Sequence, residues 1–128
     1  MFPKVSITES WVVIEFSTWD KLLNASHKDV TIPRDQIASI DTGSEILKEC
    51  KGFRAPGTYT FSQTYGFGVI AGTYRQRHGI KHFWNVRAKL ADHTIRFNLL
   101  GNEYATVVVQ VEDPISILRS LGKHSVSQ

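Results

Sequence analysis

The stretch over residues 69–122, VIAGTYRQRHGIKHFWNVRAKLADHTIRFNLLGNEYATVVVQVEDPISILRSLG, decides the predicted fold. Four runs in it are rich in β-branched and aromatic residues or alternate between apolar and polar positions, which is typical of β-strands. The four predicted strands cover residues 69–76, 80–89, 94–100 and 105–111. Only a few residues join each strand to the next. Parallel neighbours need longer crossovers, so the sequence predicts an antiparallel meander.

A short helix is predicted after the strands. Asp113 can act as its N-cap, Pro114 suits the first helical position, and Gly122 suits the position just past the end. Ile117 and Leu121 lie on one apolar stripe of this helix. We therefore expect the helix to pack on the sheet, and its removal to expose the core.

The residues before this stretch predict further strands built onto it. The second run alternates, with Val12, Ile14 and Phe16 on one face, as a half-buried strand does. Pro33 limits the third strand, because proline cannot donate to a strand ladder. Thr18 is a candidate N-cap for one or two helical turns at residues 18–24. The expected strands cover residues 4–8, 11–17, 29–32 and 36–42.

Length and composition predict one soluble domain over residues 1–128. A chain of 128 residues with 41% apolar residues can bury a single core without disulfides. Cys50 is the single cysteine and cannot form an internal disulfide, and no charged-then-apolar leader follows the first methionine. The apolar runs are far shorter than the roughly 20 residues that span a bilayer. We expect a cytoplasmic protein.

Five segments carry a resemblance to a known family. Residues 31–40, TIPRDQIASI, resemble a segment of bacterial pleckstrin-homology-like domains. Residues 52–58 (GFRAPGT), together with residues 68–75, 83–86 and 109–114, are similar to a group of uncharacterised bacterial proteins of this type. The resemblance covers roughly residues 30–121.

This resemblance implies a mainly β fold. Pleckstrin-homology-like domains are barrels of two antiparallel sheets, with a C-terminal α-helix capping one end. The resemblance further implies a general role as an adaptor or binding module, and it brings no established activity. Phosphoinositide-binding relatives carry basic residues around the first loop, where this chain has Glu9 and Glu15 and no arginine. The resemblance therefore does not imply that lipid site.

The central hairpin carries the candidate ligand-binding residues. Arginine side chains bind phosphate well when two or more converge. The candidates are Arg75, Arg77, Lys81 and Arg87. The alternative is a solvated hairpin face whose basic residues discourage pairing at a sheet edge. The formal charge of +3, from 15 basic and 12 acidic residues, tolerates an anionic partner without requiring one.

No motif for catalysis, a metal or a cofactor rises above chance. His78 and His82 straddle a predicted turn without a partner at zinc spacing, and Cys50 lacks the local signature of a nucleophile. We therefore expect no enzyme, no metal and no cofactor. The alternative is a small-ligand barrel or hydrolytic enzyme that uses the glycine-rich loop at residues 44–68. An enclosed apolar cavity beneath that loop would favour this alternative.

The function expected from the sequence is a non-catalytic binding or scaffolding module. A protein partner or self-association comes first, because such a barrel leaves strand edges that another chain can extend. An anionic membrane surface, contacted through the basic hairpin residues, is the second candidate. Nucleic acid ranks third, because the aromatic and glycine residues at 65–68 lack a second aromatic strand close behind them.

Overall fold

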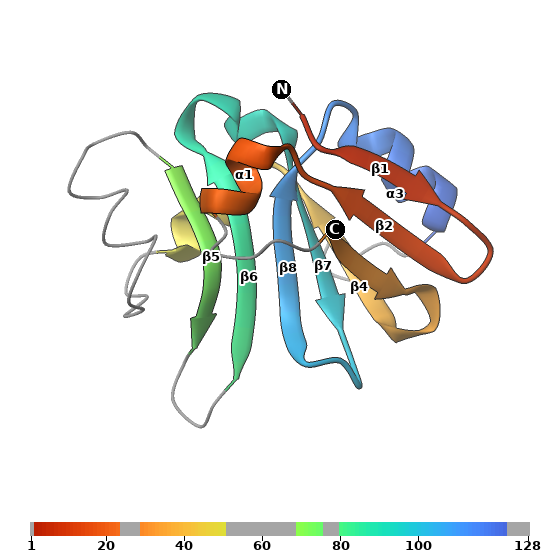
Figure 1. The fold of residues 1–128 in the computed structure, drawn as a ribbon. Helices are drawn as coiled ribbons and strands as arrows, with labels where there is room; N and C mark the ends of the chain where they lie inside the picture. The colour runs from red at the N-terminus through yellow and green to blue at the C-terminus, as the bar shows by residue number, and fades with distance from the viewer. Residues whose placement is uncertain (1, 24–28, 51–68, 76–79, 123–128) are drawn as a thin grey trace.

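The described part of the chain forms two β-sheets and two α-helices (Figure 1). It is taken from a computed structural model, which describes residues 2–23, 29–50, 69–75 and 80–122. The predicted turn at His78-Gly79 and most of the 44–68 loop lie outside these residues.

The first sheet has three antiparallel strands in the order β1-β2-β3. Its strands are β1 (Lys4–Ile7), β2 (Trp11–Glu15) and β3 (Val30–Pro33). Val12 and Ile14 face the interior and are fully buried, as the alternation predicts. Helix α1 (Thr18–Leu23) follows β2, as expected. Its N-cap is Ser17 and not Thr18, because the Ser17 hydroxyl accepts a hydrogen bond from the Asp20 N–H at 3.2 Å.

The second sheet has five strands in the order β4-β7-β8-β6-β5. Short 3₁₀ segments flank β4: η1 (Arg34–Gln36) precedes it and η2 (Ser44–Cys50) follows it. The strands are β4 (Ile37–Thr42), β5 (Val69–Arg75), β6 (Lys81–Arg87), β7 (Thr94–Leu99) and β8 (Tyr104–Gln110). The hairpins β5–β6 and β7–β8 confirm two of the three predicted antiparallel pairings.

The prediction of a continuous antiparallel meander is wrong at one step. Strand β8 lies between β6 and β7 and pairs with β6 in parallel. The connection is η4 (Ala88–His93), a six-residue 3₁₀ segment long enough to pass the end of one strand. The Gln110 side chain fixes this crossing, because it accepts from the Arg87 N–H at 2.7 Å and donates to the Arg87 carbonyl at 2.8 Å.

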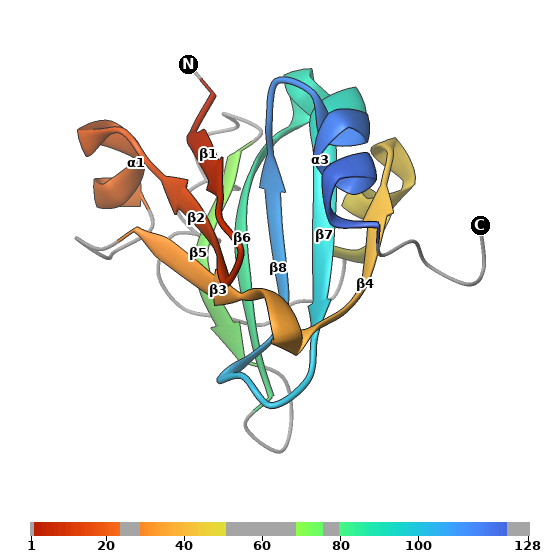
Figure 2. The same ribbon diagram turned by 90° about the vertical axis from the view of Figure 1, so that its right-hand side faces the viewer.

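The core lies between the two sheets. Phe97 and Val107 from the large sheet pack in the same apolar cluster as Ile14 from the small one. Figure 2 shows the strands of the small sheet crossing those of the large sheet at a steep angle. The described strands leave β1 and β3 at the edges of one sheet and β4 and β5 at the edges of the other, so the sheets are not joined into a closed barrel.

Helix α3 (Pro114–Leu121) confirms the predicted C-terminal helix. The Asp113 carboxylate accepts from the Ser116 N–H at 3.1 Å, and Gly122 ends the helix with φ of 66°. Leu121 is buried in the core, and Ile117 and Leu118 pack against it. The helix covers part of the space between the sheets on the side of β4 and β1.

Candidate binding site

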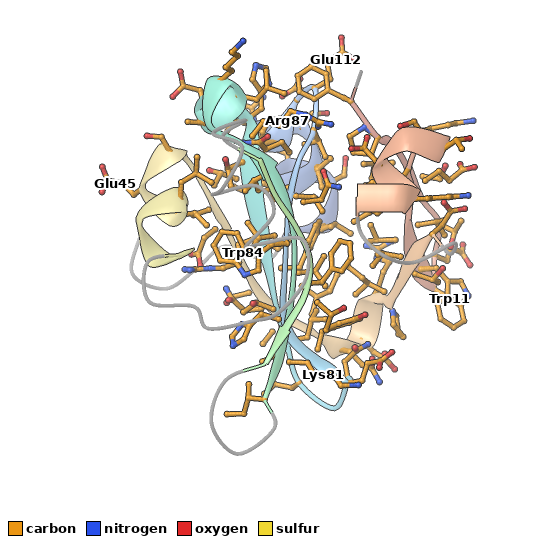
Figure 3. All side chains as sticks on the ribbon, turned by 60° about the vertical axis from the view of Figure 1, so that its left-hand side comes forward. Trp11, Glu45, Lys81, Trp84, Arg87 and Glu112 are labelled. Carbon is orange, nitrogen blue, oxygen red and sulfur yellow. The ribbon has the colours of Figure 1, made fainter. Side chains whose placement is uncertain are left out.

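The structure separates the basic residues that the sequence singled out. Lys81 and Arg87 lie at opposite ends of β6, with Trp84 between them (Figure 3). Arg75 is the Cα partner of Lys81 across the β5–β6 pair, so its backbone lies at the Lys81 end of the hairpin. Arg77 lies outside the described residues. Lys81 and Arg87 therefore do not converge on one ligand.

Arg87 holds two elements together. Its guanidinium donates to the Asp20 carboxylate at 2.8 Å, and Asp20 is only 3% exposed. The pair joins helix α1 to strand β6. Removing one partner of such a pair leaves an uncompensated charge away from water, so this contact is part of the fold. Lys81 forms a second pair, with Glu103 at 3.3 Å, and this pair is near the surface.

A concave surface lies between β1 and α3, and we call it the β1–α3 groove. Its volume is about 450 Å³. One wall is strand β1 and the other is the face of helix α3. The lining residues are Pro3, Lys4, Val5, Ile7, Val111, Glu112, Asp113, Ser116, Ile117 and Ser120.

Among the described strands, β1 pairs only with β2, so the wall that it forms is a strand edge. The Thr8 N–H donates to the Trp11 carbonyl at 2.9 Å, which makes these facing residues a hydrogen-bonded pair. Hydrogen-bonded and non-hydrogen-bonded pairs alternate along antiparallel strands. Ile7 faces Val12 and Val5 faces Ile14, so both are non-hydrogen-bonded positions. The backbone N–H and C=O groups of Val5 and Ile7 therefore point away from β2, toward the open edge.

The chemistry of the groove suits an extended polypeptide. Val5 and Ile7 pack on the core with their side chains, while their outward backbone groups offer two donors and two acceptors. Ile117 supplies apolar surface above the buried Val111, and Ser116 and Ser120 supply hydroxyl groups on the helix wall. A chain laid along β1 could continue the ladder and place alternate side chains on this apolar surface.

Sequence reasoning missed this groove. It identified the β1 region as a strand and residues 114–121 as a helix, but nothing in either segment shows that they border the same space. The usable signal was the apolar alternation of Val5 and Ile7 in a strand close to the chain's first residue. The 44–68 loop, which the sequence favoured as a site, is described only over its first residues, where Ile46 is buried.

Comparison of the chain with protein-family models, curated proteins and solved structures finds no match. No helix in the described ranges is long and apolar enough to cross a membrane. Across the same ranges, no three His, Cys, Asp or Glu side chains gather as a metal site would require. The arguments about function therefore rest on the geometry of the chain itself.

Proposed function

We propose that the protein is a non-catalytic binding module that takes an extended segment of a partner protein along β1. The observation that carries the proposal is the row of outward backbone groups at Val5 and Ile7, on an unpaired edge that borders the β1–α3 groove. Main-chain hydrogen bonds supply affinity in strand addition, and pockets for alternate side chains supply specificity.

The expected free-energy contributions predict a modest affinity of the protein for the partner segment. Each intramolecular hydrogen bond contributes roughly 0.5–1.5 kcal/mol net, and two strand residues can exchange about four such bonds with a partner. Burial of alternate apolar side chains against the partly exposed Ile117 adds about 25 cal/mol per Å² of apolar surface. The loss of chain entropy in the partner segment opposes these gains. Reversible binding is the expected behaviour of such a module.

The fold is consistent with a variant of the pleckstrin-homology-like architecture, which we include in the proposal. Two crossed sheets and a C-terminal helix support it. The parallel β6–β8 pair departs from a barrel made only of antiparallel pairs. A helix beside an open strand edge is the feature that the proposed binding mode uses, and it does not depend on barrel closure.

Proline at position 5 tests the binding mode. Val5→Pro removes an outward N–H and leaves the hydrogen bonds to β2 in place, because the Val5 N–H is not part of that ladder. Segments selected from a random peptide library against the wild type should bind the variant about tenfold more weakly or worse. Isothermal titration calorimetry measures the affinity, and circular dichroism checks the fold.

Thr31→Pro is the matched control at the other edge of the same sheet. The Arg34 N–H donates to the Ser10 carbonyl at 2.9 Å, so the alternation places Thr31 at a non-hydrogen-bonded position whose N–H points outward. This variant should bind the selected segments as the wild type does. Equal affinity in the Val5 variant, or an equal loss in the Thr31 variant, would rule out strand addition at β1. Self-association through β1 would show instead as a dimer in sedimentation that Val5→Pro dissolves.

A further inference from the structure

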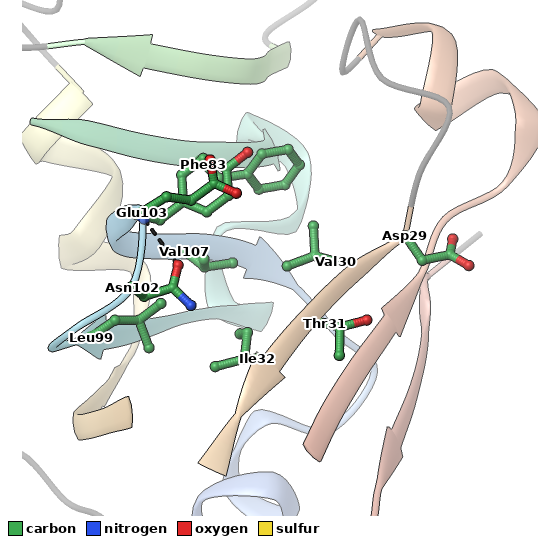
Figure 4. A pocket seen from close by; sticks show the side chains of 10 residues that line it. Asp29, Val30, Thr31, Ile32, Phe83, Leu99, Asn102, Glu103 and Val107 are labelled. Atoms are coloured by element: carbon green, nitrogen blue, oxygen red, sulfur yellow. Dashed lines mark hydrogen bonds between the residues drawn. The ribbon is translucent and has the colours of Figure 1, made fainter. Parts of the chain in front are cut away.

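A second pocket lies at the opposite edge of the small sheet, between β3 and the turn that joins β7 to β8 (Figure 4). We call it the β3–β8 pocket. Its volume is about 270 Å³, slightly below the usual range for drug-sized ligands, so the pocket suits a smaller molecule. The residues that line it are Asp29, Val30, Thr31, Ile32, Phe83, Leu99, Asn102, Glu103, Tyr104 and Val107.

The floor of this pocket is formed by apolar side chains that are themselves almost fully buried, and it contains an aromatic pair. Val30 and Ile32 point into it from β3, and Val107 lies on the other side (Figure 4). Phe83 and Tyr104 meet edge to face, with ring centroids 5.9 Å apart. A short alkyl chain or a single ring would be removed from water here, which favours an apolar ligand body.

Two acidic residues carry the charge of the lining. Asp29 and Glu103 line the pocket, and no lysine or arginine does so among the described residues. The Glu103 side chain lies beside Phe83 at the mouth, whereas the Asp29 carboxylate is turned away from Val30 (Figure 4). Asp29 is already bound, since it pairs with Lys21 at 3.4 Å and accepts from the Phe16 N–H at 3.2 Å. Glu103 is therefore the acid that a ligand can reach.

Glu103 is held only loosely by the protein. Its carboxylate pairs with Lys81 at 3.3 Å, and its side chain is 66% exposed. Pairs of this kind contribute little to stability, so a competing cation can replace the lysine at low cost. The ring of Tyr104, which is partly exposed, adds an attraction for a cation, because the face of an aromatic ring carries negative charge.

We propose that the β3–β8 pocket binds a small organic ammonium ion. The apolar body of the ligand lies against the partly exposed Val30 and Tyr104, above the buried floor of the pocket, and its ammonium group binds the Glu103 carboxylate in place of Lys81. This site is independent of the β1–α3 groove, because the two lie at opposite edges of the small sheet. It also reverses the role that the sequence suggested for Lys81, which here competes with a cation instead of binding an anion.

The test compares three probes that share a six-carbon chain: hexylammonium, 1-hexanol and hexanoate. Amide chemical shifts of the full chain, followed during titration, locate the site and give each dissociation constant. Hexylammonium should bind about threefold tighter than hexanol and about tenfold tighter than hexanoate, with shifts centred on β3 and residues 102–104. Hexanoate binding as tightly as hexylammonium, or shifts centred elsewhere, would overturn the proposal.

Variants at the mouth decide the role of charge. Glu103→Gln should remove the preference for hexylammonium over hexanol, and Lys81→Met should strengthen hexylammonium binding about twofold or more because it removes the competitor. Glu9→Gln, an exposed acid in the turn between β1 and β2 that lines neither the β3–β8 pocket nor the β1–α3 groove, is the matched control and should change nothing. Val30→Trp should block all three probes by filling the pocket. Glu103 and Lys81 are near the surface, so their variants keep the test valid even if Val30→Trp does not fold. If Glu103→Gln still prefers hexylammonium over hexanol, the proposed site is excluded.

Discussion

Replacing Asp41 with alanine is expected to lower the free energy of unfolding by about 3–5 kcal/mol, because the change removes a buried carboxylate that binds a largely buried arginine. Asp41 is 7% exposed and lies on the face of the large sheet opposite the core. The Arg96 guanidinium donates to its carboxylate through Nε at 3.0 Å and also through Nη2. The Asn98 amide donates to the same oxygen at 2.9 Å. The carboxylate thus ties β4 to β7 through three hydrogen bonds.

Urea denaturation measures this effect, as a fall in the midpoint at an unchanged slope. Asp35→Ala is the control, since Asp35 is an exposed acid in η1, close along the chain to β4. That control should change the free energy of unfolding by no more than about 0.5 kcal/mol. A loss below about 1 kcal/mol in Asp41→Ala would contradict a structural role for the Asp41–Arg96–Asn98 cluster.

Truncating Trp84 to alanine should cost about 3–5 kcal/mol of unfolding free energy, as large aromatic truncations in packed sites do. Trp84 is 2% exposed although it lies on the face of β6 opposite Phe83. It is flanked in register by Val108 on β8 and by Gly72 on β5. Gly72 is buried and has φ of 122°, a region that side chains rarely adopt, so the backbone opposite the indole carries no side chain.

Trp11→Ala is the matched control for this prediction. Trp11 is 46% exposed on β2, so its truncation should cost less than about 1 kcal/mol in the same denaturation assay. Similar losses for the two tryptophans would contradict the burial of the outer face at Trp84. The alternation of apolar and polar residues alone would suggest that the outer face of the large sheet is solvated. A large loss of stability in Trp84→Ala would show that this face is buried at Trp84.

The local elements could be predicted from the sequence, because local rules produce them. Alternation in β2 and β7 predicted which residues are buried, and the caps at Asp113 and Gly122 predicted helix α3. The order of the strands could not be predicted in the same way. Alternation gives the two faces of a strand but not its neighbours, so the insertion of β8 between β6 and β7 left no signal.

The candidate site was harder to predict for the same reason. Arg87 looked like a surface cation because its partner Asp20 is 67 positions away in the sequence. The edge of β1 becomes a binding surface only because no described strand pairs with it and because α3 closes the groove. Both facts depend on contacts between distant segments. The proposed binding module therefore follows from topology and not from a sequence motif.

Amide hydrogen exchange at β1 tests the central claim most directly. In the free protein, the amides of Val5 and Ile7 should exchange fast while the Ser6 amide, which faces β2 at a hydrogen-bonded position, exchanges slowly. Addition of a selected partner segment should slow exchange at Val5 and Ile7 about tenfold or more. If Val5 and Ile7 are already as protected as Ser6 in the free protein, or stay unprotected when the segment binds, the partner does not add a strand to β1.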